Sequence, residues 1–136
     1  MKNLATSIWN GNGSKGTGHL TTHSKTLSNV PFTYSSRTQE GKGTNPEEMV
    51  AAAHAGCFSM KLAFLLEAAG YTATELNVDC EITFEAGKIT NSHLTLKGQI
   101  AGIAKPEFDE LVADAKDNCP ISKLLNTTLT IEASLL

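Results

Sequence analysis

The chain has 136 residues, of which 40% are hydrophobic and 18% charged, a balance typical of a globular domain and not of a disordered segment. Its formal net charge of −3 argues against nucleic acid as the main partner, because binding to phosphates requires a basic surface. The first seven residues contain no apolar stretch long enough for a signal peptide, so we expect a cytoplasmic protein. Three cysteines in that compartment favour a functional thiol over a disulfide scaffold.

The first forty-odd residues are rich in Gly, Ser, Thr and Asn and predict short strands joined by glycine turns. The glycines of residues 11–16 match the dinucleotide pattern G-x-G-x-x-G, but no hydrophobic strand precedes them and no helix follows. We therefore interpret Asn12-Gly13 as a hairpin turn and expect no nucleotide cofactor. The predicted strands are Thr6–Trp9, His19–His23 and Phe32–Ser35.

A long helix is predicted next. Asn45 is suited to cap it, Pro46 fits the first helical position, and Glu47 and Glu48 complement the helix dipole. The helix should end near Ala69, because a glycine follows. Its middle is apolar nearly all round, which predicts a central helix covered on several sides. Polar residues interrupt the apolar run, so we expect no membrane span and no membrane partner.

The remaining sequence predicts strands and shorter helices, and we expect a single domain over residues 1–136. Apolar residues alternate strictly with polar ones from Leu76 to Phe84, which is typical of a strand with one buried face. Cys80 falls on that buried face, where we interpret it as a small hydrophobic residue. The later elements are a strand over 89–101, a helix over 106–117, a short helix over 120–125 and a strand over 127–133.

Cys57, in the middle of the long helix, is a candidate nucleophile. A thiol with an ordinary pKa is only a few per cent ionised at neutral pH, and the thiolate is the reactive form. Cys57 lies too far from the helix start for the dipole to lower that pKa, so a cation is needed. Arg37, just before the helix, is a candidate, and Glu47 or Glu48 could hold its guanidinium in place. A solvated arginine and ordinary first-turn acids remain the alternative.

Cys119 and His54 are further candidates. Cys119 directly precedes a proline, so as the N-cap of a short helix its sulfur would receive backbone N–H groups. A second thiol can condense with a sulfenic acid to form a disulfide. His54 lies on the helical face of Cys57, which leaves open a Cys–His dyad, a metal site completed by Cys119, or a histidine hydrogen-bonded in the core.

The segment Gly43–Met60 (GTNPEEMVAAAHAGCFSM) and the segment Asn118–Leu125 (NCPISKLL) resemble the OsmC branch of the OsmC/Ohr family of thiol peroxidases. The resemblance extends over nearly the whole chain. It implies an α+β fold with antiparallel sheets around two long central helices, in an intertwined homodimer. It also implies no cofactor, since metal, flavin and haem play no part in the family reaction.

Residue roles also follow from the resemblance. Cys57 matches the peroxidatic cysteine, Cys119 the resolving cysteine, Glu47 the family glutamate and Arg37 the arginine before the helix. The implied activity is reduction of organic hydroperoxides, and of hydrogen peroxide as a second substrate. A dithiol would regenerate the enzyme, and a lipoyl group is the expectation from the related branch. The alternatives are a Cys–His hydrolase or transferase and a non-catalytic ligand-binding member of the fold.

Overall fold

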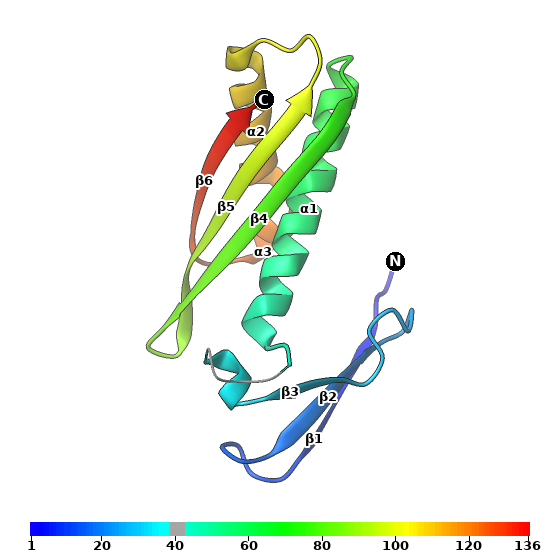
Figure 1. Ribbon diagram of the computed structural model, residues 1–136, viewed down its shortest axis with the longest axis vertical. Helices are drawn as coiled ribbons and strands as arrows, with labels where there is room; N and C mark the ends of the chain where they lie inside the picture. The colour runs from blue at the N-terminus through cyan, green and yellow to red at the C-terminus, as the bar shows by residue number, and fades with distance from the viewer. Residues whose placement is uncertain (39–42) are drawn as a thin grey trace. The chain divides into compact units, whose positions relative to one another are not determined.

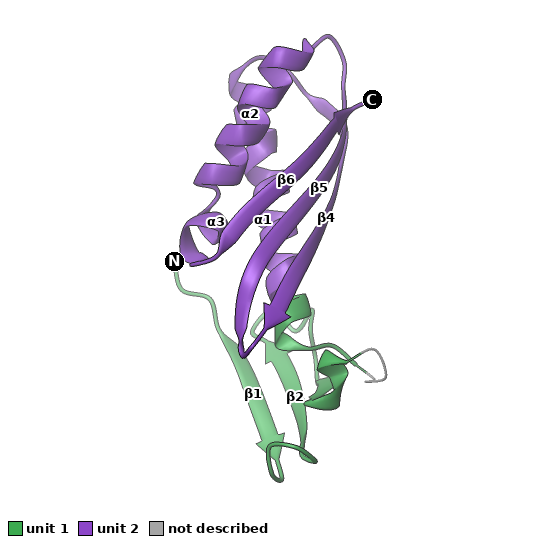
Figure 2. Ribbon diagram, turned by 90° about the vertical axis from the view of Figure 1, so that its left-hand side faces the viewer, with its two compact units in different colours: residues 1–49 green, residues 50–136 purple. Residues whose placement is uncertain are grey.

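The structure is a computed structural model that describes residues 1–38 and 43–136 (Figure 1). It divides into two compact units, residues 1–49 (unit 1) and residues 50–136 (unit 2), and each unit is described by itself (Figure 2). The expectation of one domain over residues 1–136 stays a prediction.

Unit 1 is a three-stranded antiparallel sheet in the order β1-β2-β3, followed by a short 3-10 helix. The predicted hairpin is confirmed, because β1 and β2 pair directly and residues 11–16 connect them. The left-handed residue of this connection is Gly11, with φ 95°, and Asn12 closes the loop by accepting a hydrogen bond from the Lys15 backbone N–H at 2.8 Å. The bounds are β1 Ala5–Asn10, β2 Thr17–Thr22, β3 Val30–Thr33 and η1 Ser35–Arg37.

Helix α1, Pro46–Ala68, starts in unit 1 and continues through unit 2. Asn45 caps it as predicted, since its Oδ1 accepts a hydrogen bond from the Glu48 backbone N–H at 2.8 Å. The predicted end is also correct to within a residue, and Gly70 follows with a left-handed φ of 88°. By length and composition α1 qualifies as a possible membrane span, a test that core helices of soluble proteins also pass.

Unit 2 contains a second sheet in the order β4-β5-β6, formed by Ala73–Glu85, Lys88–Ile100 and Thr128–Leu135. Strands β4 and β5 pair as an antiparallel hairpin. The expectation of purely antiparallel sheets is wrong at the other pair, because β6 runs parallel to β5. The two helices between these strands supply the long crossover that a parallel connection needs.

The helices of unit 2 lie on one face of this sheet (Figure 2). They are α1, α2 (Lys105–Asn118) and α3 (Pro120–Leu124). Their buried side chains meet the inward face of β5, where Leu94, Leu96 and Ile100 are buried. The core of unit 2 therefore lies between the helices and the sheet. Cys119 is part of this core, and Cys57 packs against it.

Candidate active site

Helix α1 presents Cys57 beside its buried stripe. The fully buried side chains of α1 recur at every fourth position and are His54, Phe58, Leu62 and Leu66. Cys57 precedes one of them directly, so its thiol is partly covered and packs against the core. The helix thus holds a thiol at the boundary between core and solvent.

Cys119 ends α2 and caps the start of α3, as predicted. Its Sγ accepts a hydrogen bond from the Ser122 backbone N–H at 3.3 Å and lies 3.0 Å from the Ser122 hydroxyl. Pro120 occupies the first helical position, where a missing N–H costs nothing. The Cys119 side chain is fully buried.

The two thiols are brought together. The Cys119 thiol and the Ile121 backbone N–H both lie near enough to the Cys57 thiol to act on its pKa. Burial raises the pKa of Cys57, the Ile121 N–H opposes that rise, and the charge and hydrogen bond of Cys119 add to it. A cation that ionises Cys57 at neutral pH is therefore still required, as the sequence argument states.

A surface groove of about 570 Å³ opens beside Cys57 in unit 2. Most of its lining is apolar, and Met60 and Phe64 of α1 are 62% and 64% exposed there. A groove of this kind next to a thiol suits a substrate with a hydrocarbon group. The remaining lining residues are Ala53, Lys61, Asn118, Pro120 and Ile121.

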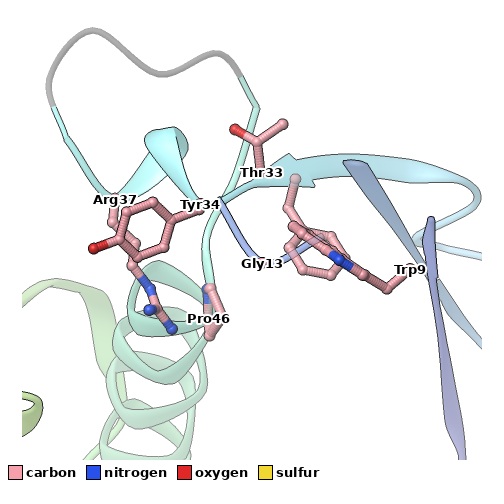
Figure 3. A pocket seen from close by; sticks show the side chains of 7 residues that line it. Trp9, Gly13, Thr33, Tyr34, Arg37 and Pro46 are labelled. Atoms are coloured by element: carbon pink, nitrogen blue, oxygen red, sulfur yellow. The ribbon is translucent and has the colours of Figure 1, made fainter. Parts of the chain in front are cut away.

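Arg37 and Glu47 form an ion pair in unit 1, with 3.2 Å between Arg37 Nε and Glu47 Oε2. The guanidinium also lies 5.9 Å from the centre of the Tyr34 ring, within range of a cation–π contact. Figure 3 shows the Arg37 and Tyr34 side chains together near Pro46, in the lining of a pocket of about 180 Å³. Glu48, the other glutamate considered, instead accepts a hydrogen bond from the Thr44 hydroxyl at 3.4 Å.

The four residues predicted for the site thus form two pairs, Arg37 with Glu47 in unit 1 and Cys57 with Cys119 in unit 2. Part of the sequence segment that supported Arg37, residues 39–41, lies outside the described residues.

His54 is fully buried and hydrogen-bonded on both ring nitrogens. Nδ1 lies 2.7 Å from the Ser92 hydroxyl, and Nε2 lies 2.8 Å from the Ser122 hydroxyl. The interpretation of a hydrogen-bonded core histidine is therefore confirmed. A Cys–His dyad gains no support, because both ring nitrogens are engaged by serines. Burial lowers the pKa of His54.

The sequence analysis missed the two serines. Ser92 lies at an inward position of β5, where the alternation predicts an apolar residue. A serine at such a position is a sequence signal for a buried polar contact. Ser122 is the third residue of α3, so its backbone contact with the N-cap Cys119 follows from helix geometry. Their joint contact with His54 spans 38 and 68 residues of sequence and has no local signal.

Cys80 lies on the inner face of β4, as predicted, and packs partly against the core. Its Sγ is 3.4 Å from the Ser92 hydroxyl, and burial raises its pKa. Across residues 1–38 and 43–136, no group of three or more His, Cys, Asp or Glu side chains is arranged to hold a metal ion. The alternative of a metal site on His54, Cys57 and Cys119 therefore has no cluster to support it.

Comparison with known proteins decides the family. The family model described as OsmC-like protein matches residues 39–134. The chain belongs to the OsmC-like protein family. It is 36% identical over 132 residues to Peroxiredoxin OsmC of Escherichia coli, an alignment that covers 93% of this chain and 92% of the relative. It is also 23% identical to Organic hydroperoxide resistance protein-like 1 of Staphylococcus saprophyticus, over 87% of this chain and 86% of that one.

Solved structures support the same fold. An OsmC-like protein from Mycoplasma pneumoniae superposes with a TM-score of 0.76, at 14% identity, over 100% of this chain and 98% of its own. The organic hydroperoxide resistance protein OhrB of Bacillus subtilis superposes with a TM-score of 0.67, at 21% identity, over 98% of both chains. The expected α+β fold of the OsmC/Ohr type is therefore confirmed.

Proposed function

We propose that this OsmC-like protein is a thiol peroxidase that reduces organic hydroperoxides through Cys57 and Cys119. The observation that carries the proposal is that Cys119 lies near enough to Cys57 to act on its pKa, beside an apolar groove that Cys57 lines. The 36% identity to a protein named as a peroxiredoxin supports the same reaction class. Two thiols in contact are what disulfide-forming peroxide chemistry requires.

In the proposed reaction, the Cys57 thiolate attacks the distal oxygen of the hydroperoxide and releases an alcohol. Cys57 becomes a sulfenic acid, and Cys119 condenses with it to a disulfide and water. Arg37, oriented by Glu47, supplies the positive charge that keeps Cys57 ionised and polarises the peroxide. A dithiol, for which we propose a lipoyl-type group, then reduces the disulfide.

The apolar groove supports an organic hydroperoxide as the substrate. Ala53 and Ile121, which line the groove beside Cys57, would contact its hydrocarbon group, and hydrogen peroxide, which lacks one, would be the poorer substrate. The relatives named for organic hydroperoxide resistance support this choice.

We further propose that the chain works as a single domain in a cytoplasmic homodimer. The support is the exposed side of α1, which is itself apolar and carries Gly56, Met60 and Phe64 among small residues. A face of this kind on a long helix is typical of a surface that another subunit covers.

Stopped-flow consumption of cumene hydroperoxide tests the function. The parent protein should consume peroxide rapidly, and Cys57→Ser should fall to the rate of buffer alone. Mass spectrometry after one equivalent of peroxide should find a Cys57–Cys119 disulfide with Cys80 still open to alkylation. Peroxide consumption by Cys57→Ser at the parental rate would favour the non-catalytic alternative. A disulfide that includes Cys80 would remove Cys119 from its proposed role.

A further inference from the structure

A chain of hydrogen bonds leads from the resolving thiol into the core of unit 2. Cys119 Sγ lies 3.0 Å from Ser122 Oγ, which lies 2.8 Å from His54 Nε2. The other ring nitrogen, Nδ1, lies 2.7 Å from Ser92 Oγ. All four side chains are buried, so water does not compete for these contacts. The chain ends on a thiol that the proposed reaction must deprotonate.

This chain of hydrogen bonds costs free energy of folding if its only role is packing. Polar groups buried beside Phe58 and Leu62 lose their hydration, whereas an apolar side chain would not. Each member can both donate and accept: a serine hydroxyl does so by rotation, and a neutral imidazole has one N–H and one acceptor nitrogen. Donors and acceptors can therefore exchange roles along such a chain of hydrogen bonds. A chain that ends on a fixed charge does not allow this exchange.

Two thiols approach His54 from other elements of unit 2. Cys80 approaches from β4, with Sγ 3.9 Å from Nδ1, and Cys119 approaches from the start of α3 through Ser122. Cys57 lies three positions further along α1. Serine hydroxyls from β5 and α3 occupy both ring nitrogens. The ring is neutral near pH 7 and is free to accept one proton through Ser122.

We infer that Ser122 and His54 form a proton relay that takes the thiol proton from Cys119 while Cys119 attacks oxidised Cys57. This inference rests on the proposed peroxidase function. The S–H proton of Cys119 passes to Ser122 Oγ, and the Ser122 hydroxyl proton passes to His54 Nε2. Ser122 touches the reacting sulfur, and His54 acts through Ser122 as a positioning residue.

The step is balanced. A bond forms between the two sulfurs while the S–O bond of the Cys57 sulfenic acid breaks, and its electron pair leaves with the oxygen as hydroxide. The Cys119 sulfur is oxidised and the Cys57 sulfur is reduced. Hydroxide and the proton released by His54 combine to water. The products are one disulfide and one water molecule, with no further reactant.

Rapid-quench mass spectrometry separates the two steps, because dimedone traps sulfenic acid and an alkylating agent marks free thiols. In a single turnover, Ser122→Ala should slow disulfide formation by about 10²-fold, the usual contribution of general-base catalysis, and should slow the formation of sulfenic Cys57 far less. His54→Gln retains an amide for hydrogen bonding but takes up no proton, so it should also slow disulfide formation far more than the formation of sulfenic Cys57. Sulfenic Cys57 should accumulate in both variants.

Two controls separate the relay from a structural effect. Ser122→Thr retains the hydroxyl and should restore disulfide formation. Ser59→Ala removes a hydroxyl of α1 that donates to the Ala55 carbonyl of the same helix at 2.8 Å, and should change neither step. The pH profile is the second readout. Without the relay, the rate of disulfide formation should depend more steeply on pH than in the parent, because hydroxide must then remove the proton that the relay takes.

The relay is overturned if Ser122→Ala and His54→Gln form the disulfide at the parental rate, or if both steps slow equally. If these variants do not fold, the solvent isotope effect on disulfide formation in the parent decides, and a value near one overturns the relay. The proposed function fails separately, and the relay with it, if the parent forms no Cys57–Cys119 disulfide.

Discussion

At the scale of single residues, the molecule places its reactive groups where their surroundings oppose ionisation. Burial raises the pKa of Cys57 and of Cys80 and lowers that of His54, so all three groups are held in their neutral forms. The proposed relay charges His54 only while the disulfide forms, whereas attack on the peroxide needs a thiolate that is already present at Cys57. Its thiolate therefore depends on a cation, and the proposed source is Arg37.

The first prediction concerns that cation. Replacing Arg37 by methionine should shift the pH at which Cys57 ionises upward, because the proposed positive charge is lost while much of the side-chain volume remains. The ultraviolet absorbance of the thiolate, compared with Cys57→Ser to isolate this group, measures the shift. Lys15→Met removes an exposed charge and serves as a control. An unchanged midpoint in Arg37→Met would contradict the role proposed for Arg37.

The second prediction concerns the pH dependence of stability. His54 has a lowered pKa when folded, so the unfolded chain binds its proton first as the pH falls below about 6.5. The free energy of unfolding should therefore decrease from pH 7 to pH 5, by at most about 1.4 kcal/mol per pH unit for this one proton. Denaturant unfolding measures the slope.

His54→Gln should flatten this slope, and replacement of the exposed His19 by glutamine should not. Equal slopes in the two variants would show that burial of His54 does not govern the pH dependence.

At the scale of elements, the long hairpin of β4 and β5 depends on one two-residue turn. Ala86 and Gly87 connect the strands with φ angles of 49° and 82°, which is the left-handed conformation at both central positions of a type I′ turn. Glycine adopts it without strain, whereas alanine does so at a cost. The turn therefore sets the register of the sheet although its first residue is unfavourable.

The third prediction follows from this turn. Ala86→Asn should raise the free energy of unfolding by about 0.5–1 kcal/mol, because asparagine tolerates the left-handed conformation better. Gly87→Ala should lower it, since the added Cβ meets no atom and only the backbone conformation is strained. Denaturant midpoints for the two variants measure both effects. Midpoints that move in the same direction would contradict the argument.

At the scale of the whole molecule, α1 has more apolar surface than unit 2 covers. One side packs into the core through Phe58 and Leu62, while Met60 and Phe64 on the other side remain exposed. An apolar surface of this kind along a long helix is stable in water when a partner covers it. The proposed homodimer provides that partner.

The fourth prediction tests the dimer. Phe64→Arg should weaken self-association strongly, because a charge at an apolar contact loses its hydration without compensation. Glu110→Arg introduces the same side chain at an exposed position of α2 and should leave association unchanged. Analytical ultracentrifugation over a range of protein concentrations measures both. A parent that sediments as a monomer, or a Phe64→Arg variant that associates as the parent does, would contradict the proposal.

Much of the fold could be predicted from local patterns. Caps, proline positions and apolar periodicity determined the course of α1, the hairpin of β4 and β5, and the role of Cys119 as an N-cap, because each depends on residues a few positions apart. The direction of β6 could not be predicted, since strand pairing is decided by contacts distant in sequence.

Some features of the candidate site could likewise be predicted from the sequence, and others could not. The sequence by itself predicted two thiols and a cation for the site from segments that resemble the family, and these roles stay predictions. Only the tertiary structure placed the Cys119 thiol against Cys57 and joined Ser92, His54 and Ser122 in one buried chain. These contacts arise where a strand, a long helix and a short helix pack together, and no local pattern encodes which hydroxyl will face a buried imidazole.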